Sequence, residues 1–307
     1  MLWDALWIRD VVVTSEMNRV TDTDIDRWSS DLKWVIGSPF LMITADSDQG
    51  EQAQCPEIAM RDFSAEGAGE YTEKYSGHRV GYYFESLIHY WLKHVRKLEI
   101  LAQGFQIINE GRTLGELDFV FRDEMGRVIH WEVAAKFYLY CEDREVKGSH
   151  YIGPNAQDTF ELKREKIFDK QLPLSERAFP EVSFRQAFVK GRIFYHPEAK
   201  ELESLPLGMM PDHLRGIWIR HGELSWLQRE ERTEVAYHLI EKPYWLSPEC
   251  FSVSGSSPFP FRKLIEHLAF HFSDSKRPVL ISVLVQEGGL WQETDRVFVV
   301  ADDWPEL

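Results

Sequence analysis

Residues 114–140 read LGELDFVFRDEMGRVIHWEVAAKFYLY, and this stretch decides how the chain folds. Apolar side chains alternate with others on both sides of the polar sequence DEMGR, which predicts two strands joined by a turn. Within that turn, Gly126 can adopt the positive φ angle that a tight reversal needs. Four charged side chains lie among the large apolar residues of this hairpin: Glu116, Asp118, Glu132 and Lys136. The hairpin therefore holds charge where a purely structural hairpin would hold core residues.

The charged side chains of the hairpin share faces. Successive side chains of a strand point to opposite sides, so Glu116 and Asp118 lie on the face opposite Leu117, Phe119 and Phe121. On the second strand the charged face carries Val128, His130, Glu132, Ala134 and Lys136. Each strand is thus predicted to separate an apolar face from a face that bears charge.

Closing the hairpin brings two carboxylates together. If Arg122 lies opposite Val128, then Asp118 lies opposite Glu132. Like charges directly opposite on a sheet repel, and two desolvated carboxylates keep a proton or bind a cation. Carboxylate oxygens with room for water suit Mg²⁺ or Mn²⁺. The pattern predicts a metal site; the alternative is that these side chains simply face solvent.

The overall charge limits the partners of the chain. The chain has 307 residues, a formal net charge of -15 and a pI of about 5.2. This balance excludes a surface coated for non-specific binding of nucleic acid or membranes, but it is compatible with a local basic groove. Its hydrophobic content of 44% is ordinary for a globular protein with a sizeable core.

The cysteines and the apolar runs of the sequence indicate the cellular compartment in which the protein is expected. Cys55, Cys141 and Cys250 are far apart and lack zinc-site or redox spacing, which favours a reducing environment. The N-terminal sequence lacks a signal-peptide pattern, and no run approaches the roughly 18 apolar residues of a membrane span. We therefore expect a cytoplasmic protein without a membrane segment.

The order of predicted elements indicates an α/β fold with three parts. These parts are an N-terminal helical segment with a polar loop (1–77), a central core (78–200) and a C-terminal α/β extension packed on the core (201–307). The core is predicted to contain a helix (78–98), a strand (99–108), the hairpin, a helix (158–172) and a strand or strand pair (182–196). Asp158 or Thr159 is a candidate cap of the second helix. The extension is predicted to contain a hairpin (215–227), a helix (257–272) and strands (278–286 and 295–303).

The hairpin and its neighbours carry a resemblance. The order helix, strand, strand, strand, helix, strand, with an acid on one hairpin strand and Glu and Lys on the next, resembles the PD-(D/E)xK nuclease superfamily. Most of residues 25–307 further resemble the bacterial family named domain of unknown function 1853. The blocks that carry this second resemblance are RTLGELDFVFRD, WEVAAKFYL, YIGPNAQDTFELK, KQLPL and WQETDRVFVVADDWP. The resemblance implies a restriction-endonuclease-like core, a mixed sheet flanked by helices.

The chain departs from the superfamily motif at two positions. Leu117 stands before Asp118, where the motif has proline. The lysine of the motif follows two residues late, at Lys136 instead of Ala134. Because two residues along a strand return to the same face, a lysine at this position still lies on the side of Glu132.

The resemblance implies a role for each candidate residue. It implies a Mg²⁺ (or Mn²⁺) ion held by Glu85, Asp118, Glu132 and the carbonyl of Val133, with Asp118, Glu132 and Lys136 as the catalytic residues. Lys136 would position the attacking water, and Lys163 or Gln171 would hold a phosphate. The implied substrate is nucleic acid, DNA in preference to RNA, and a protein partner could deliver it.

Two other functional readings stay open. One is a nuclease-fold binding or interaction protein that retains an inactive acidic site. The other is an α/β protein unrelated to nucleic acid, whose hairpin charges are merely exposed. This third reading predicts that Asp118 and Glu132 lie far from Glu85.

Other motifs favour structural roles. His267 and His271 lie four residues apart on a predicted helix, but aromatic neighbours and the absence of a HExxH pattern favour packing over a metal. The sequence SVSGSS (252–257) is not a nucleophile elbow and indicates a loop. The sequence has no GxGxxG or Walker-type loop, so it gives little support for a nucleotide-binding fold of those types.

Overall fold

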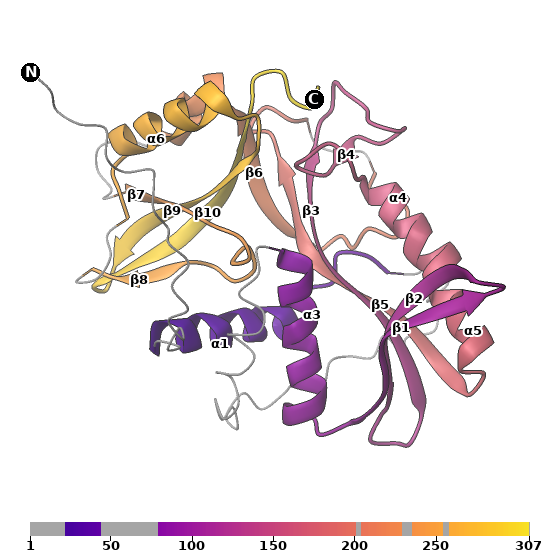
Figure 1. Ribbon diagram of the computed structural model, residues 1–307. Coiled ribbons are helices and arrows are strands. Elements are labelled where there is room, and N and C mark those ends of the chain that lie inside the picture. The colour runs from indigo at the N-terminus through magenta and orange to yellow at the C-terminus, as the bar shows by residue number, and fades with distance from the viewer. Residues whose placement is uncertain (1–21, 44–78, 201–203, 229–234, 254–257, 307) are drawn as a thin grey trace, which may run out of the picture.

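The computed structural model describes residues 22–43, 79–200, 204–228, 235–253 and 258–306 (Figure 1). The helical elements are α1 (Asp22–Gly37), α3 (Val80–Tyr90), η2 (Trp91–Val95), α4 (Phe160–Glu165), η3 (Lys166–Gln171), η4 (Leu172–Leu174), α5 (Ser175–Ala178), η5 (His221–Leu227) and α6 (Phe261–Asp274). The strands are β1 (Glu99–Asn109), β2 (Arg112–Arg122), β3 (Val128–Tyr140), β4 (Tyr151–Ile152), β5 (Val182–Tyr195), β6 (Leu214–Arg220), β7 (Val235–Leu239), β8 (Cys250–Ser252), β9 (Val279–Glu287) and β10 (Leu290–Val300). The predicted polar loop at 46–77 lies outside the described residues.

A mixed sheet of ten strands forms the centre of the molecule. Its main order is β1-β2-β3-β5-β6-β10-β9-β7, with β4 paired to β3 and β8 paired to β10. Strands β1, β2 and β3 are antiparallel, β3, β5, β6 and β10 run parallel, and β9 and β7 complete the sheet antiparallel. The fold is α/β, and one continuous sheet joins the predicted core to the predicted extension through the β5–β6 pairing.

Strand β3 is buried on both faces. On one face Trp131 lies between Trp91, at the end of α3, and Phe188 of β5, with ring centroids 6.1 and 4.6 Å away. On the other face Ala134 and Tyr138 belong to a second apolar cluster that includes Phe160 of α4. The face of β3 that bears the charged side chains is therefore covered by protein. Exposure to solvent does not explain why carboxylates occur on this face.

Several predicted elements are confirmed and their boundaries have physical causes. The predicted helix at 158–172 begins as α4 after Thr159, whose hydroxyl accepts a hydrogen bond from the Leu162 N–H, and continues through the π-helical turn η3. The predicted strand at 182–196 is the single long strand β5. The helix predicted at 257–272 starts only at Phe261, because Pro260 occupies the N-cap position in extended conformation.

The predicted hairpin at 215–227 is wrong. Only its first half is a strand, β6, and residues His221–Leu227 form the 3₁₀ helix η5. Glu223 causes the turn, because its side chain accepts a hydrogen bond from the Arg220 N–H at 2.7 Å. The Gly222 N–H donates to Asp302 at 2.7 Å and fixes the turn against the end of β10. Apolar alternation did not reveal these long-range partners.

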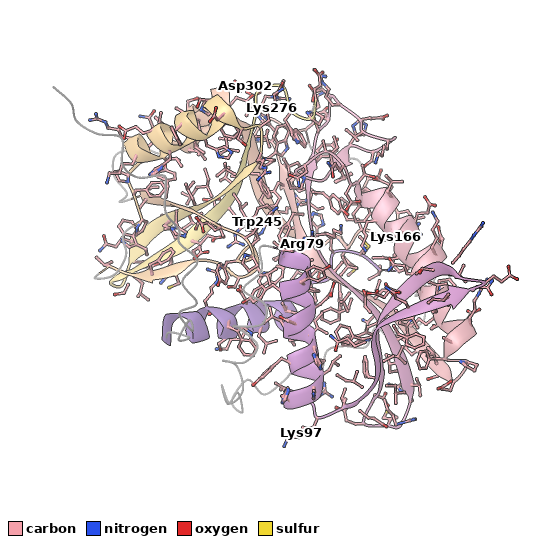
Figure 2. The ribbon with its side chains drawn as sticks, in the orientation of Figure 1. Arg79, Lys97, Lys166, Trp245, Lys276 and Asp302 are labelled. Carbon is pink, nitrogen blue, oxygen red and sulfur yellow. The ribbon has the colours of Figure 1, made fainter. Side chains whose placement is uncertain are left out.

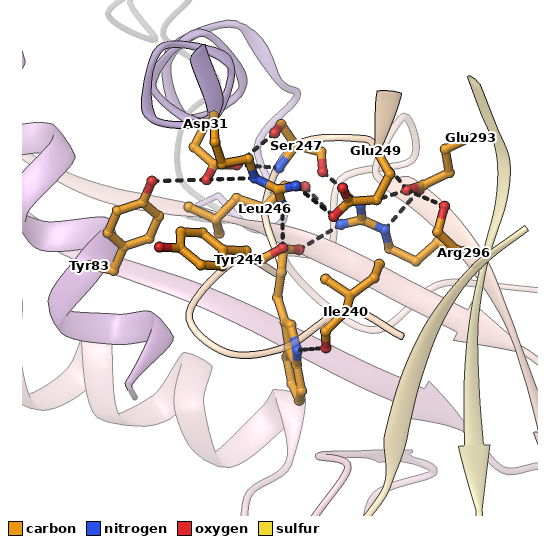
Figure 3. Close-up of polar contacts among 12 residues, drawn as sticks. Asp31, Tyr83, Ile240, Tyr244, Leu246, Ser247, Glu249, Glu293 and Arg296 are labelled. Atoms are coloured by element: carbon orange, nitrogen blue, oxygen red, sulfur yellow. Dashed lines mark hydrogen bonds and ion pairs between the residues drawn. The ribbon is translucent and has the colours of Figure 1, made fainter. Parts of the chain in front are cut away.

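A buried polar network ties α1 and α3 to the C-terminal half of the chain (Figure 3). Arg27 of α1 contacts Asp31 at 3.2 Å and Glu249 at 2.6 Å, and the Tyr83 hydroxyl of α3 donates to Asp31 at 2.9 Å. Arg296 of β10 donates to three carbonyls, those of Trp245, Leu246 and Ser247, and to the carboxylate of Glu293. The network fixes α1 against α3 and against the C-terminal half of the chain.

Among the described helices, none is long and apolar enough to span a membrane.

Candidate active site at the fork of strands β2 and β3

Strands β2 and β3 pair over a short distance and then separate. Their ladder runs from Arg122 opposite Val128 to Phe119 opposite Trp131, which confirms the predicted register. Beyond that pair β2 continues only against β1, and β3 continues against β5. Asp118 and Glu132 are the first residues past the last pair. We call this point the fork.

Asp118 closes the fork on the β2 side. Its carboxylate Oδ2 accepts the backbone N–H of Val133 at 2.8 Å, in the place where a β2 carbonyl would otherwise continue the ladder. Burial and, after it, the charge of Glu132 raise the pKa of Asp118 to about 7, against the opposing effect of the hydrogen bond from Val133. At neutral pH Asp118 is poised between its charged and its neutral form.

Glu132 is almost fully buried, with 1% of its surface exposed. Its Oε1 lies 2.9 Å from His130 Nε2, and Gln171 of η3 donates to its Oε2. Burial raises its pKa to about 7, although the positive charge of Lys163 opposes this shift. The pKa of His130 falls to about 4, chiefly because the ring is buried, so His130 is neutral at pH 7. A neutral ring donates from one nitrogen only, so an ionised Glu132 fixes that proton on Nε2.

Glu85 approaches the same place from helix α3. Burial, together with the nearby negative charges of Asp118 and Glu116, raises the pKa of Glu85 to about 7. The structure therefore brings Glu85 within electrostatic range of Asp118. The reading in which the hairpin acids lie far from Glu85 does not hold for Asp118. The separation of β2 from β3 explains how an acid from a helix can reach the strand acids.

Lys163 of α4 is the cation that faces the acids. Burial lowers its pKa, and the charges of Lys136 and Lys166 lower it further, whereas Asp118 and Glu132 raise it. These mutual effects place Lys163 within electrostatic range of both fork acids. Lys136 is engaged elsewhere, because its ammonium donates to Asp158 Oδ2 at 2.5 Å. Lys163 therefore acts electrostatically on the carboxylate pair, whereas the described ion pair of Lys136 is with Asp158.

The helical periodicity of the segment α4–η3 places Lys163 and Gln171 on the side of the helix that faces the fork. Lys163 and Gln171 lie four residues to either side of Ile167, which is fully buried in the apolar cluster beneath the helix. The π-helical turn at Lys166–Gln171 widens the repeat and carries Gln171 to Glu132. Anchoring through Ile167 explains why two residues eight positions apart reach one site.

The donor set fits a divalent cation held by two carboxylates. No group of three or more His, Cys, Asp or Glu side chains is arranged to hold a metal within the described part of the chain. Mg²⁺ needs only one or two carboxylates, because water and substrate oxygens complete its shell. Asp118 and Glu132 meet that need, and each has a raised pKa that a cation would lower. Glu85 lies near this pair and is not part of a three-acid cage.

The structure adds three functional candidates to those expected from the sequence: His130, Asp158 and Lys166. His130 and Asp158 hold Glu132 and Lys136 in place, and the charge of Lys166 acts on Glu132. Strand alternation places His130 on the same face of β3 as Glu132, so the contact between these two side chains could be predicted from the sequence. Asp158 lies 22 positions after Lys136 in the sequence, beyond the end of β3 and beyond β4, and no local pattern indicates that the two side chains meet.

The His267 and His271 pair packs as predicted. The ring of His267 lies 5.1 Å from that of Phe259, and His271 Nε2 lies 2.8 Å from the carbonyl oxygen of Arg277. These contacts account for both rings through packing and a backbone hydrogen bond.

A search among curated proteins found no match to this chain. Against protein families, residues 30–300 match the family described as Domain of unknown function (DUF1853). This span includes the fork, both helices that approach it and nearly all of the sheet. The match therefore covers the whole site and most of the described fold, and the protein belongs to the DUF1853 family.

Proposed function

We propose that this protein is a metal-dependent phosphodiesterase of the restriction-endonuclease-like PD-(D/E)xK type, acting on nucleic acid and on DNA in preference to RNA. The fork carries the proposal, because two desolvated carboxylates lie where two strands separate, with an acid of helix α3 and the half-buried Lys163 of α4 within electrostatic range. Clustered titratable groups with strongly shifted pKa values are typical of active sites.

The acids would hold the metal. Asp118 and Glu132 are the ligands that the chain offers, with the Val133 carbonyl as a further oxygen and Glu85 behind them. Bound Mg²⁺ or Mn²⁺ would polarise the phosphodiester and lower the pKa of a bound water. The hydrogen bonds from His130 and Gln171 fix the Glu132 carboxylate, so that it does not reorient during the reaction.

The remaining groups would act on the phosphate and on the proton. Lys163 would stabilise the charge that develops on the phosphate, because its ammonium faces the acid pair from a partly dehydrated position. Lys136, oriented by Asp158, would contact the strand on the other side of the scissile phosphate. Glu85, whose pKa lies near 7, would accept a proton from water at neutral pH.

Cleavage of supercoiled plasmid with Mg²⁺ or Mn²⁺ tests the proposal. The wild type should nick or linearise the plasmid, and chelation with EDTA should stop the reaction. Asp118→Asn and Lys163→Gln should each lower the rate at least 100-fold, in the range typical for removal of one electrostatic group from an active site. Asp169→Asn is the matched control for Asp118→Asn, because it makes the same chemical change at an exposed position. Asp169 lies on the same helical segment as Lys163. Equal rates for Asp118→Asn and Asp169→Asn would rule out a fork-based nuclease.

A second candidate is a nuclease-fold protein that binds nucleic acid or a protein partner without cleaving it. The observation in its favour is the pairing of Lys136 with Asp158, which leaves the motif lysine away from the acids. Calorimetry with Mg²⁺ separates the candidates at the first step. Metal binding that vanishes in Asp118→Ala with Glu132→Ala favours the enzyme, and DNA binding without metal binding favours the second candidate.

A further inference from the structure

A cavity lies beside β3 on the C-terminal side of the fork, where the sheet meets the loop after β4. Its volume is about 330 Å³. Arg79 and Val80 at the start of α3 line one wall, and Lys242 and Trp245 line another. Figure 2 shows Arg79 beside Trp245, with Lys97 beyond the opposite end of the helix. We call this space the cation pocket.

The cation pocket concentrates positive charge in an acidic protein. Arg79, Lys136 and Lys242 line it, and among its described lining residues Asp158 is the one carboxylate. That carboxylate already receives the ammonium of Lys136 at 2.5 Å. Lys242 lies over the Trp245 ring at 4.6 Å. In a chain with a formal net charge of -15, such an excess of cations around one cavity favours an anionic ligand.

The remaining walls are rigid and provide both apolar and hydrogen-bonding surface. Trp245 donates from Nε1 to the Ile240 carbonyl at 3.0 Å and meets the ring of Phe137 edge to face at 5.6 Å. The loop wall is held at Pro154, whose carbonyl accepts from Trp304 Nε1 at 2.9 Å. Asn155 and Gln157 on the same loop add amide groups. Such a mixture of flat apolar walls, a few amides and cations suits a nucleotide.

We infer that the cation pocket binds a phosphorylated nucleotide unit, with its phosphate between Arg79 and Lys242 and its sugar and base against the apolar wall. The volume, at the small end of ligand sites, accommodates one nucleotide and not a duplex. Lys136 lines the pocket, and four residues of strand separate its backbone from that of Glu132 at the fork by about 13 Å. A nucleotide in the pocket would thus belong to the same strand as the scissile phosphate, a few positions away.

This inference rests on the proposed function and deepens it, because it names a single unpaired nucleotide, a few positions from the cleavage position, as part of the substrate. The affinity of the pocket for a nucleotide does not itself need the fork chemistry. Binding and cleavage can therefore be tested apart.

Calorimetry with 2′-deoxyadenosine 5′-monophosphate, in the presence of EDTA, tests the pocket. The wild type should bind this nucleotide, and deoxyadenosine without the phosphate should bind at least tenfold more weakly. Arg79→Gln and Lys242→Gln should each weaken nucleotide binding at least fivefold. Lys97→Gln makes the same charge change at an exposed position remote from the pocket, and it should leave the affinity unchanged.

The outcomes distinguish failure of the pocket from failure of the proposed function. If nucleotide binding is absent at millimolar concentration, or equal in all variants, the pocket inference is wrong even when the plasmid is cleaved. If binding depends on Arg79 and Lys242 but no cleavage occurs, the pocket stands and the nuclease proposal fails. Far-UV circular dichroism of both variants checks that these exposed substitutions leave the fold intact.

Discussion

The desolvation of the fork acids, Asp118 and Glu132, leads to a prediction about the stability of the protein that is independent of catalysis. Asp118→Asn should stabilise the protein at pH 8 in the absence of metal. An ionised Asp118 is solvated in the unfolded chain, but in the folded protein it lies partly desolvated beside Glu132. Asparagine keeps an oxygen that can accept the Val133 N–H and carries no charge.

The magnitude and the sign follow from the pKa of Asp118. Folding raises this pKa from 3.8 to about 7, so between these values the folded state holds a proton that the unfolded state has lost. The contribution of Asp118 to the free energy of unfolding therefore falls as the pH rises from 4 to 7, and it is level above 7. Each pH unit is worth at most about 1.36 kcal/mol, and coupling to Glu132 and residual hydration reduce this. Between pH 5 and pH 8 we expect the advantage of Asp118→Asn over the wild type to grow by about 1–2 kcal/mol.

Urea denaturation with EDTA at both pH values, for the wild type and the variant, measures this difference. Asp169→Asn, at an exposed position, controls for the loss of one negative charge and should show no such growth. If the advantage of Asp118→Asn does not grow with pH, or if the variant is less stable than the wild type at pH 8, the carboxylate is not desolvated and the account of the fork is wrong.

Three further predictions concern the metal, a glycine and the buried network. Affinity for Mg²⁺ should rise between pH 6 and pH 8 because binding releases the protons of the fork acids, and calorimetry in buffers of different ionisation enthalpy counts the protons released. Gly191→Ala should destabilise the protein by about 3 kcal/mol or more, because the new Cβ would lie 1.7 Å from the Lys136 carbonyl oxygen at a φ of +155°. Gly81→Ala, whose Cβ meets nothing within 4 Å, should instead stabilise the protein by about 0.5 kcal/mol. The midpoints of urea denaturation measure both changes. Arg296→Met should cost about 3–5 kcal/mol because it leaves Glu293 buried without its cation, and the thermal midpoint should fall accordingly.

The local geometry of the hairpin could be predicted from the sequence because it depends on alternation and one turn. The register from Arg122 opposite Val128 follows from the position of the turn, and the two faces of β3 follow from strand periodicity. Contacts made through distant segments could not be predicted. Nothing near Lys136 in the sequence indicates Asp158 as its partner, and nothing near Glu132 indicates that a π-helical turn brings Gln171 to it.

The faces of the sheet illustrate the same limit. Alternation separated the charged residues of β3 from its apolar residues, but it left open whether the charged face meets water or protein. The answer depends on the helical segment α4–η3, which packs on that face through Phe160 of α4 and Ile167 of η3 and thereby desolvates Glu132. The raised pKa values, and with them the case for a functional site, arise from this tertiary packing.

The continuous sheet has a consequence for dissecting the protein. A fragment of residues 78–200 would keep the fork, but it would end β5 as an edge whose last residues, Arg192–Tyr195, lose their partners in β6. It would also remove Lys242 and Trp245, and so one wall of the cation pocket. An unpaired apolar strand edge promotes association between chains. Minimal fragments of this family should therefore aggregate, and loss of activity on truncation would reflect a damaged sheet even when every fork residue is present.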